Sequence, residues 1–180
     1  MKKITLILSI LLFTTITANS QITKGNWMVG GSGDYTNETV TSDTGTKTKY
    51  TVITIKPNVG YFIIDKFAVG GTLNYMHQGS FNTYGIGLFS RYYFLKPEKI
   101  FNLYAQIHYD YDINVSDVTF TRRTINTQFY GARMGMEVFF NNSVGLEFSL
   151  QYEKGVLNNA NSDTFKTVIG FQIYLEKNKI

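Results

Sequence analysis

Hydrophobic and polar residues alternate one by one along most of this chain, most clearly from residue 51 to residue 75. Ile53 and Ile55 fall on one parity of this stretch, whereas Lys56 and Asn58 fall on the other. Successive side chains of an extended strand point to opposite faces of its sheet, so this pattern predicts strands with one apolar and one polar face. We interpret the stretch as a hairpin of two such strands.

Two local features of the hairpin carry further expectations. Ile64, Asp65 and Lys66 interrupt the alternation and predict a tight turn between the two strands. Pro57 lies within the first strand, and a proline removes one hydrogen bond from the ladder. We therefore expect a bulge or a local bend at Pro57.

The same alternation recurs along the chain and predicts eight strands. They are expected at about residues 25–35, in the two arms of the 51–75 hairpin, and at 82–94, 101–111, 127–140, 144–153 and 165–175. Long polar connections are expected at 36–48, 112–126 and 154–163, and shorter ones elsewhere. Long and short connections alternate when one end of a barrel faces the cell exterior and the other faces the periplasm.

The distribution of charge indicates which face of each strand meets which solvent. A soluble lipocalin-like barrel would hold its apolar face inside, whereas a membrane barrel would turn that face to lipid. The apolar faces carry essentially no charge at their centres. The opposite faces hold the charged side chains of Lys56, Arg91, His108, Asp110, Arg133, Glu137, Glu147, Glu153 and Lys166.

Aromatic residues are concentrated near the ends of the expected strands, which is typical of the aromatic girdles at lipid headgroup level. One group lies by the short turns, at Tyr61, Phe62, Phe67, Tyr92, Phe94, Phe101 and Phe139. The other lies by the long loops, at Tyr35, Tyr50, Tyr75, Tyr109, Tyr111, Tyr152 and Phe165. The sequence thus predicts an all-β fold, an eight-stranded antiparallel up-and-down transmembrane β-barrel.

The N-terminus predicts export. Lys2 and Lys3 precede an apolar run, and Ala18 and Ser20 suit a cleavage site, so we interpret residues 1–20 as a signal peptide. The alternative is an uncleaved anchor, but the run is shorter than the roughly 20 residues that a spanning helix needs. A single barrel domain is then expected over residues 21–180.

Composition removes several other classes of protein. The chain has no cysteine, which excludes a disulfide framework and a lipid-modified cysteine. No segment after the expected signal peptide reaches 18 uninterrupted apolar residues, so helical membrane spans are not predicted. The net charge is +4 for the full chain, and its basic residues form no run that would suggest nucleic-acid binding.

A barrel of eight strands is too narrow for a wide channel, and side chains fill its interior. Charged side chains in that interior must be paired, because an unpaired buried charge is costly. We therefore predict a charge network in the lumen that holds the wall together, in preference to a catalytic or ion-conducting site. Its members are Lys56, Arg91, Arg133, Glu137 and Glu147.

The sequence offers little support for catalysis or for a cofactor. His77 and Ser80 could meet in one loop, and His108 falls on the lumen face, but no orienting acid stands at an evident spacing. No cluster has the ligand spacing of a metal site. A further hypothesis places a divalent cation or the counterions of lipopolysaccharide at Asp34 and Asp43. We predict no enzyme, no cofactor and no metal.

Four segments resemble the small outer-membrane β-barrels of the OmpA-like superfamily, particularly the short ones common in the Bacteroidetes. They are GNWMVGGSGDY, KPNVGYFIIDKFAVGGTLNY, GLFSRYYF and the closing IGFQIYL with Tyr174 as its aromatic. The resemblance covers the chain after the signal peptide and implies insertion by the barrel assembly machinery. Its motifs belong to a fold and specify no chemistry.

Two functions follow as hypotheses. The first is a structural or surface-interaction role in the cell outer membrane, with the segments 36–48 and 112–126 making the contacts. The alternative is a barrel that binds or transports a small solute or a lipophilic ligand. In either case we expect a monomer that contacts outer-membrane lipid and lipopolysaccharide.

Overall fold

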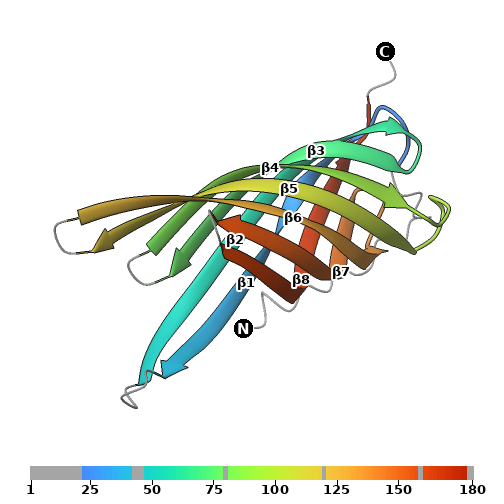
Figure 1. Ribbon diagram of the computed structural model, residues 1–180. Coiled ribbons are helices and arrows are strands. Elements are labelled where there is room, and N and C mark those ends of the chain that lie inside the picture. The colour runs from blue at the N-terminus through green and yellow to red at the C-terminus, as the bar shows by residue number, and fades with distance from the viewer. Residues whose placement is uncertain (1–21, 42–46, 79–80, 119–120, 158–159, 178–180) are drawn as a thin grey trace, which may run out of the picture.

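The computed structural model describes residues 22–41, 47–78, 81–118, 121–157 and 160–177, which form eight strands and their connections. Each strand pairs antiparallel with the next, and β8 pairs with β1 to close the barrel (Figure 1). The predicted fold class is confirmed. The strands are β1 Trp27–Thr41, β2 Lys47–Ile64, β3 Phe67–Gln78, β4 Phe81–Tyr93, β5 Phe101–Val118, β6 Thr121–Phe139, β7 Val144–Leu157 and β8 Ala160–Leu175.

The barrel has two different ends. At the turn end, short turns at residues 65–66, 94–100 and 140–143 join the strands. At the hairpin end, the strand pairs run on beyond the barrel body as long ribbons, which Figure 1 shows at its left. No helix among the described residues is long and apolar enough to cross a membrane.

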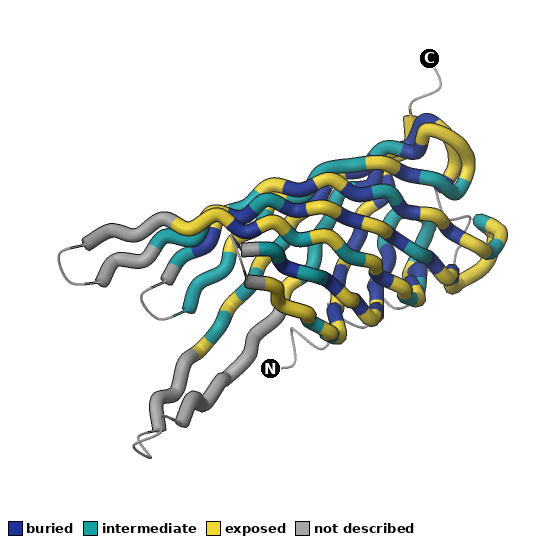
Figure 2. Tube along the Cα trace, in the orientation of Figure 1, coloured by how far each residue is buried: buried dark blue, intermediate teal, exposed yellow. Residues whose placement is uncertain are grey.

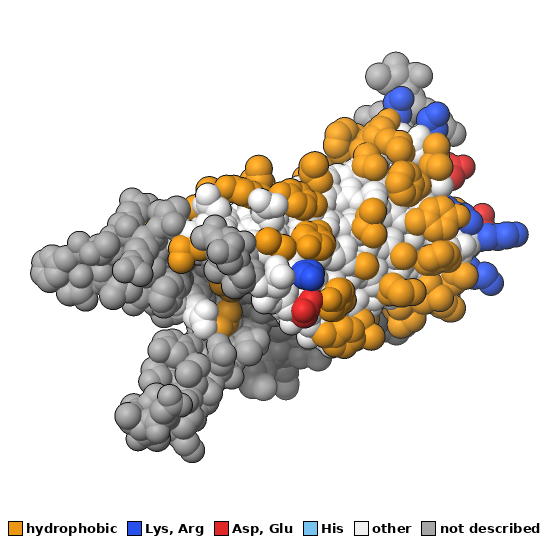
Figure 3. All heavy atoms as spheres, viewed as in Figure 1, with side chains coloured by type: hydrophobic (Ala, Val, Ile, Leu, Met, Phe, Trp, Pro, Cys, Tyr) orange, Lys and Arg blue, Asp and Glu red, His pale blue; other side chains and the backbone are white. Residues whose placement is uncertain are grey.

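Buried and exposed residues alternate along every strand of the barrel body (Figure 2). Ile55 and Leu73 are 53% and 60% exposed on the outside, whereas Asn58 is 8% exposed in the lumen. The space-filling view shows apolar side chains over the barrel body (Figure 3). Charged side chains gather at the turn end, at its right, and others lie where the ribbons begin. The predicted faces are confirmed: the outer surface is apolar and the lumen is polar.

The prediction of long polar loops from the sequence is wrong. Most of residues 36–48, 112–126 and 154–163 belongs to strands, since β1 continues to Thr41 and β5 continues to Val118. Beyond the barrel body, both faces of a two-stranded ribbon are free of a core, so its residues need no apolar parity. Backbone hydrogen bonds hold these ribbons, and an alternation of side chains cannot reveal them.

Pro57 causes no bulge, so this part of the expectation from the sequence is wrong, whereas the expected interruption of the ladder is present. It pairs with Gly31 of β1 in an uninterrupted register. Toward β3, the pairing stops after Ile55 and resumes at Asn58 in the same register. These pairs are missing because proline has no N–H to donate to the ladder. The register shift between β2 and β3 lies elsewhere, between Phe62 and Ile64.

The joint between the two ends of the sheet is short. β1 and β8 pair through seven described residue pairs, from Trp27 with Leu175 to Gly33 with Ile169. β5 and β6 pair through eighteen, from Phe101 with Val138 to Val118 with Thr121. In its hairpin-end half, β8 therefore pairs with β7 alone among the described strands, because β1 separates from β8 beyond Gly33.

An apolar floor closes the lumen at the turn end. Its buried side chains form one cluster, made of Ile22, Met28, Phe62, Ala68, Phe89, Tyr93, Tyr104, Phe139 and Tyr174. Phe62 and Phe139, which the sequence assigned to the aromatic girdle, are 0% and 2% exposed inside the barrel. They point inward because their positions have the lumen parity, whereas the neighbouring Tyr61 and Phe140 have the opposite one.

The segment before β1 completes the floor. The Lys66 amide donates to the Ile22 carbonyl at 2.8 Å, and the Gly25 amide donates to the Phe62 carbonyl at 2.8 Å. The Lys24 amide donates to Asp65 Oδ1 at 2.8 Å. These bonds fold the segment against the first turn and bring the Ile22 side chain into the cluster, where it is fully buried.

A close approach between β2 and β3 makes one lumen glycine sensitive to substitution. A Cβ at Gly70 would lie 2.6 Å from Phe89 Cζ and 2.7 Å from Gly60 Cα, and it would also collide with the Val59 carbonyl. The clash includes backbone atoms, which cannot rotate away. We expect Gly70→Ala to lower the free energy of unfolding by about 1–3 kcal/mol.

Urea unfolding, followed by the shift between folded and unfolded bands on unheated gels, measures this loss. Gly71→Ala is the matched control, because its Cβ would point outward and meet Gly87 O at an ordinary 3.5 Å. Alanine also restricts the unfolded chain, so this control should be neutral or more stable by up to about 1 kcal/mol. Equal losses in the two variants would contradict the close-approach argument.

Candidate functional site

The lumen holds two layers of polar side chains above the apolar floor. In the layer nearer the turn end, Arg91 of β4 and Glu147 of β7 form an ion pair across the lumen, and each side chain is 1% exposed. Arg91 Nε donates to Gln106 Oε1 at 2.8 Å, and Nη1 donates to the Tyr93 hydroxyl at 3.0 Å. The guanidinium thus links three strands.

A second buried carboxylate, Glu137, lies in the same layer and is 0% exposed. The Tyr93 hydroxyl donates to it at 2.8 Å, and the Tyr174 hydroxyl donates to it at 2.7 Å. The Tyr104 ring lies 4.2 Å from Arg91 Cζ, close enough for a cation–π contact. One cation, two carboxylates and three phenols therefore form a single hydrogen-bonded cluster, which we call the lower network.

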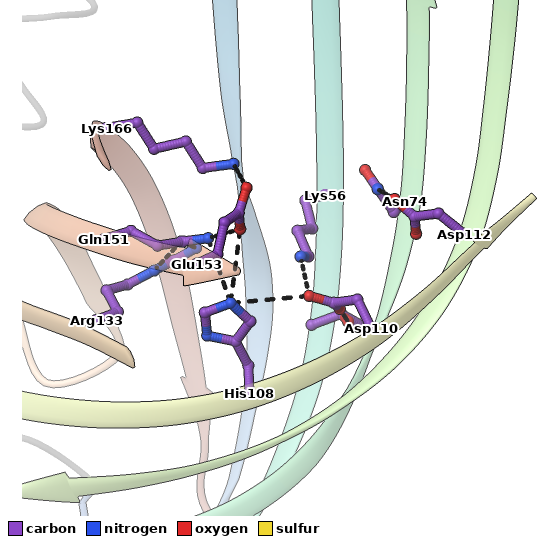
Figure 4. A network of polar contacts seen from close by, with 10 residues as sticks. Lys56, Asn74, His108, Asp110, Asp112, Arg133, Gln151, Glu153 and Lys166 are labelled. Atoms are coloured by element: carbon purple, nitrogen blue, oxygen red, sulfur yellow. Dashed lines mark hydrogen bonds and ion pairs between the residues drawn. The ribbon is translucent and has the colours of Figure 1, made fainter. Parts of the chain in front are cut away.

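A second group of polar side chains, the upper network, lies nearer the hairpin end, since Glu153 follows Glu147 along β7 toward that end. Figure 4 shows this upper network. Lys56 Nζ pairs with Asp110 Oδ2 at 2.6 Å, and Lys166 Nζ pairs with Glu153 Oε1 at 2.7 Å. His108 stands between the two pairs, with Nε2 3.6 Å from Glu153 Oε2 and 3.9 Å from Asp110 Oδ2. These side chains come from β2, β5, β7 and β8, so the upper network spans the lumen.

Arg133 belongs to the upper network through an amide. Its Nε donates to Gln151 Oε1 at 2.8 Å, and Gln151 Nε2 donates to Glu153. Within the described residues Arg133 forms no ion pair, although it is 6% exposed. Arg133 and Glu137 therefore do not meet, even though they lie four residues apart on β6.

The five residues predicted as one network are divided between two. Arg91, Glu137 and Glu147 come together in the lower network, and Lys56 and Arg133 lie in the upper one. Asp110 and Glu153 were expected on the lumen face but not as members of the network, and the uncharged partners were not predicted: Tyr93, Tyr104, Tyr174, Gln106 and Gln151. All of them share the lumen parity, so parity was the signal that could have found them.

The described part of the lumen contains small cavities. One of about 10 Å³ lies beside His108 and Arg133. Another of about 120 Å³ lies on the hairpin side, beside Asp112 and Lys166. Among the described residues no three His, Cys, Asp or Glu side chains gather in a way that could hold a metal ion.

The other candidates from the sequence show no catalytic arrangement within the part of the chain that the structure describes. His77 Nδ1 lies 2.9 Å from Asn82 Oδ1, which gives this histidine an amide neighbour. Ser80 and Asp43 lie outside the described residues, and so does the side chain of Asp34.

Comparisons with known proteins rest on structure alone. No family model matches the chain, and no curated protein matches its sequence. Among solved structures, the N-terminal β-barrel domain of Pseudomonas aeruginosa OprF aligns with a TM-score of 0.61 and 13% identity. The alignment covers 84% of this chain and 98% of that domain. This chain has the fold of the small outer-membrane β-barrels.

Two more solved structures share this outer-membrane barrel fold. Neisserial surface protein A aligns with a TM-score of 0.59 and 14% identity, over 86% of this chain and 98% of that one. The outer membrane protein OprG of Pseudomonas aeruginosa aligns with a TM-score of 0.56 and 14% identity, over 89% and 100%. At such identities the likeness concerns the path of the backbone, and the side chains of the lumen are this chain's own.

Proposed function

We propose that this chain is an integral protein of the outer membrane with a structural or surface-interaction role, and that its lumen is closed. The proposal includes an N-terminal leader, residues 1–20, that directs export. It also includes insertion by the barrel assembly machinery, contact with outer-membrane lipid and lipopolysaccharide, and a monomeric state. The barrel fold and its apolar outer surface support this placement.

One observation carries the closed lumen. Arg91 and Glu147 meet from strands on opposite sides of the barrel, and both side chains are almost fully buried. Below them the aromatic side chains of the floor fill the turn end, and Ile22 lies among these rings. A solute that crossed the barrel would have to displace both layers. The lower network, which we also call the charged plug, and the floor thus close the lumen one behind the other.

Planar bilayer recording tests this proposal. We expect the purified, refolded chain to show no conductance steps at moderate voltage and salt, because the Arg91–Glu147 pair and the floor fill the turn end of the lumen. The same preparation must show the mobility shift of a folded barrel on an unheated gel, which is the control for refolding. Steady single-channel currents from the folded protein would contradict a closed lumen.

A barrel that binds a small solute or a lipophilic ligand is the second candidate function. The cavity of about 120 Å³ on the hairpin side of the plug is the observation that favours it. Such a protein would bind its ligand from one side without letting it through. The alternative is therefore compatible with silent bilayers and needs a binding experiment.

A further inference from the structure

Two grooves lie on the outer wall of the barrel, on either side of Pro57 in β2. The first runs over β1, where Gly31 and Gly33 present no side chain to the outside, and its volume is about 380 Å³. The second lies over Gly71 of β3 and has a volume of about 390 Å³. The outward side chains that line them are apolar: Ile55, Pro57, Leu146, Ile169 and Phe171 in the first, and Val29, Pro57, Val59, Leu73 and Ile86 in the second.

Both grooves lie at the depth of one leaflet of a bilayer. The stretch of β1 from Trp27 to Gly33 spans ~20 Å along the strand, or ~15 Å along the barrel axis at the usual tilt. The hydrocarbon core of a bilayer is ~30 Å thick, so this length matches its turn-end half. Trp27 is 47% exposed, and its ring centroid lies 4.9 Å from that of Tyr61. Such aromatic residues mark the headgroup level, so acyl chains pass over the grooves.

A positive corner stands at the turn-end mouth of the first groove. The Lys177 amide donates to Asn26 Oδ1 at 3.1 Å, and a Cβ on Gly25 would lie 3.3 Å from Lys177 Cδ, so this lysine lies beside the start of β1. Lys24 directly precedes Gly25, and both lysines are exposed. No ion pair among the described residues includes either lysine. The lysines of this corner outnumber its acids: Lys24, Lys66 and Lys177 against Asp65 and Glu176.

We propose that the two grooves and this corner form a site for an anionic phospholipid of the turn-end leaflet. The phosphate pairs with Lys24 and Lys177, one acyl chain lies in the groove over Gly31, and the other lies in the groove over Gly71. Pro57 stands between the two chains. The inference rests on the proposed outer-membrane placement, in which the short turns face the periplasm.

A second copy of this chain is the competing occupant of the grooves, and charge disfavours it. Two copies inserted in one membrane point the same way, so the two-fold axis of a dimer would lie along the membrane normal. A dimer through this wall would then bring two positive corners together at the same level. An anionic headgroup meets the same corner with the opposite charge, which favours the lipid.

Trp27 is the only tryptophan of the chain, so its fluorescence reports on the lipid at the mouth of the site. The full-length chain is refolded into vesicles of phosphatidylcholine with brominated acyl chains, which quench tryptophan on contact. Unbrominated phosphatidylglycerol then replaces part of this lipid, and unbrominated phosphatidylcholine does so in a parallel series. We expect phosphatidylglycerol to restore the fluorescence with an apparent preference of about fivefold over phosphatidylcholine.

Two double variants test the corner. Lys24→Gln with Lys177→Gln should abolish the preference for phosphatidylglycerol. Lys96→Gln with Lys99→Gln removes the same charge from exposed positions between β4 and β5, at the same end of the barrel, and should leave the preference unchanged. Equal losses in both would mean a diffuse attraction to the whole turn end and would overturn the site. A Trp27 that brominated lipid does not quench would be covered by protein, as in a dimer, and would also overturn it.

Native mass spectrometry tests the grooves. The folded chain in detergent is titrated with phosphatidylglycerol, and we expect saturable addition of one lipid. Gly71→Leu fills the second groove and should weaken this binding at least about threefold. The fold tolerates a Cβ there, because it would meet Gly87 O at an ordinary 3.5 Å. Ala132→Leu enlarges an exposed outer side chain of β6, away from both grooves, and should leave binding unchanged.

Equal affinity of Gly71→Leu and the wild type would contradict the position of the acyl chains. The mobility shift on an unheated gel reports separately whether each chain folds and inserts. A folded barrel in vesicles that shows no preference for phosphatidylglycerol therefore overturns this site but not the outer-membrane placement. A chain that fails to insert into vesicles would instead contradict the proposed function.

Discussion

Replacing Arg91 by Met is expected to lower the free energy of unfolding of the barrel by about 3–5 kcal/mol. The substitution keeps a long side chain in the lumen but leaves Glu147 buried without its cation, and Glu137 lies in the same cluster. It also removes the donors to Gln106 and to the Tyr93 hydroxyl. Removing one partner of a buried ion pair costs far more than the pair contributes over apolar residues.

Urea titration of the refolded protein, read by gel mobility and by tryptophan fluorescence of Trp27, measures this loss. Arg133→Met is the matched control, since it exchanges the same two side chains one layer away. Arg133 bonds Gln151 but forms no ion pair among the described residues, so about 1–2 kcal/mol should be lost. If both variants lost the same amount, the Arg91–Glu147 pair would not be the centre of the plug.

Truncating Phe62 to Ala should cost a similar amount, about 3–5 kcal/mol, because it opens a cavity in the floor. The ring is 0% exposed, and its centroid lies 6.1 Å from that of Tyr93 and 6.2 Å from that of Tyr174. Both tyrosines hold Glu137, so the floor supports the lower network from below. The same urea titration reports the change.

Phe62→Leu provides the comparison, because it retains most of the buried volume and should cost less than about 1.5 kcal/mol. Bilayer recordings on Phe62→Ala are also informative. The Arg91–Glu147 layer remains in this variant, so it should stay silent despite its lower stability. Conductance in Phe62→Ala would show that the apolar floor, and not the charged layer, is what closes the barrel.

The faces of the strands could be predicted from the sequence because each face has its own solvent. With an alternation of period two, only two assignments of the faces are possible. Ile86 and Leu88 are exposed whereas Phe89 and Arg91 are buried, which is the assignment that places the charged face in the lumen. The turns at 65–66 and 140–143 were equally visible, since they interrupt the alternation. Class and strand number follow from these two observations.

The ends of the strands and the inner aromatics could not be predicted in the same way. Beyond the barrel body a ribbon has no core, so its polar residues look like a loop. Phe62 and Phe139 lie near turns, and this position along a strand is the one that girdle residues occupy. Parity was the better guide, because it separates the buried Phe62 from the partly exposed Tyr61 beside it.

The pairing inside the lumen depends on the stagger of the strands. Arg91 meets Glu147 across the barrel, and neither residue pairs with the other in any ladder. Which residues face each other over that distance is set when the sheet closes, and a pattern along one strand contains no information about it. The list of charged lumen residues was therefore predictable, whereas the division into two networks was not.

The short joint between β1 and β8 has a consequence for the order in which the barrel forms. Every other pair of neighbouring strands follows directly along the chain, whereas Trp27 must find Leu175 at the far end of the barrel sequence. Pairing two segments so distant in sequence has the largest entropy cost of loop closure. Seven residue pairs offset little of this cost until the whole sheet has curled into a barrel. We therefore expect closure to be the last step of folding, and we expect the pairing of β1 with β8 to limit the rate at which this barrel matures.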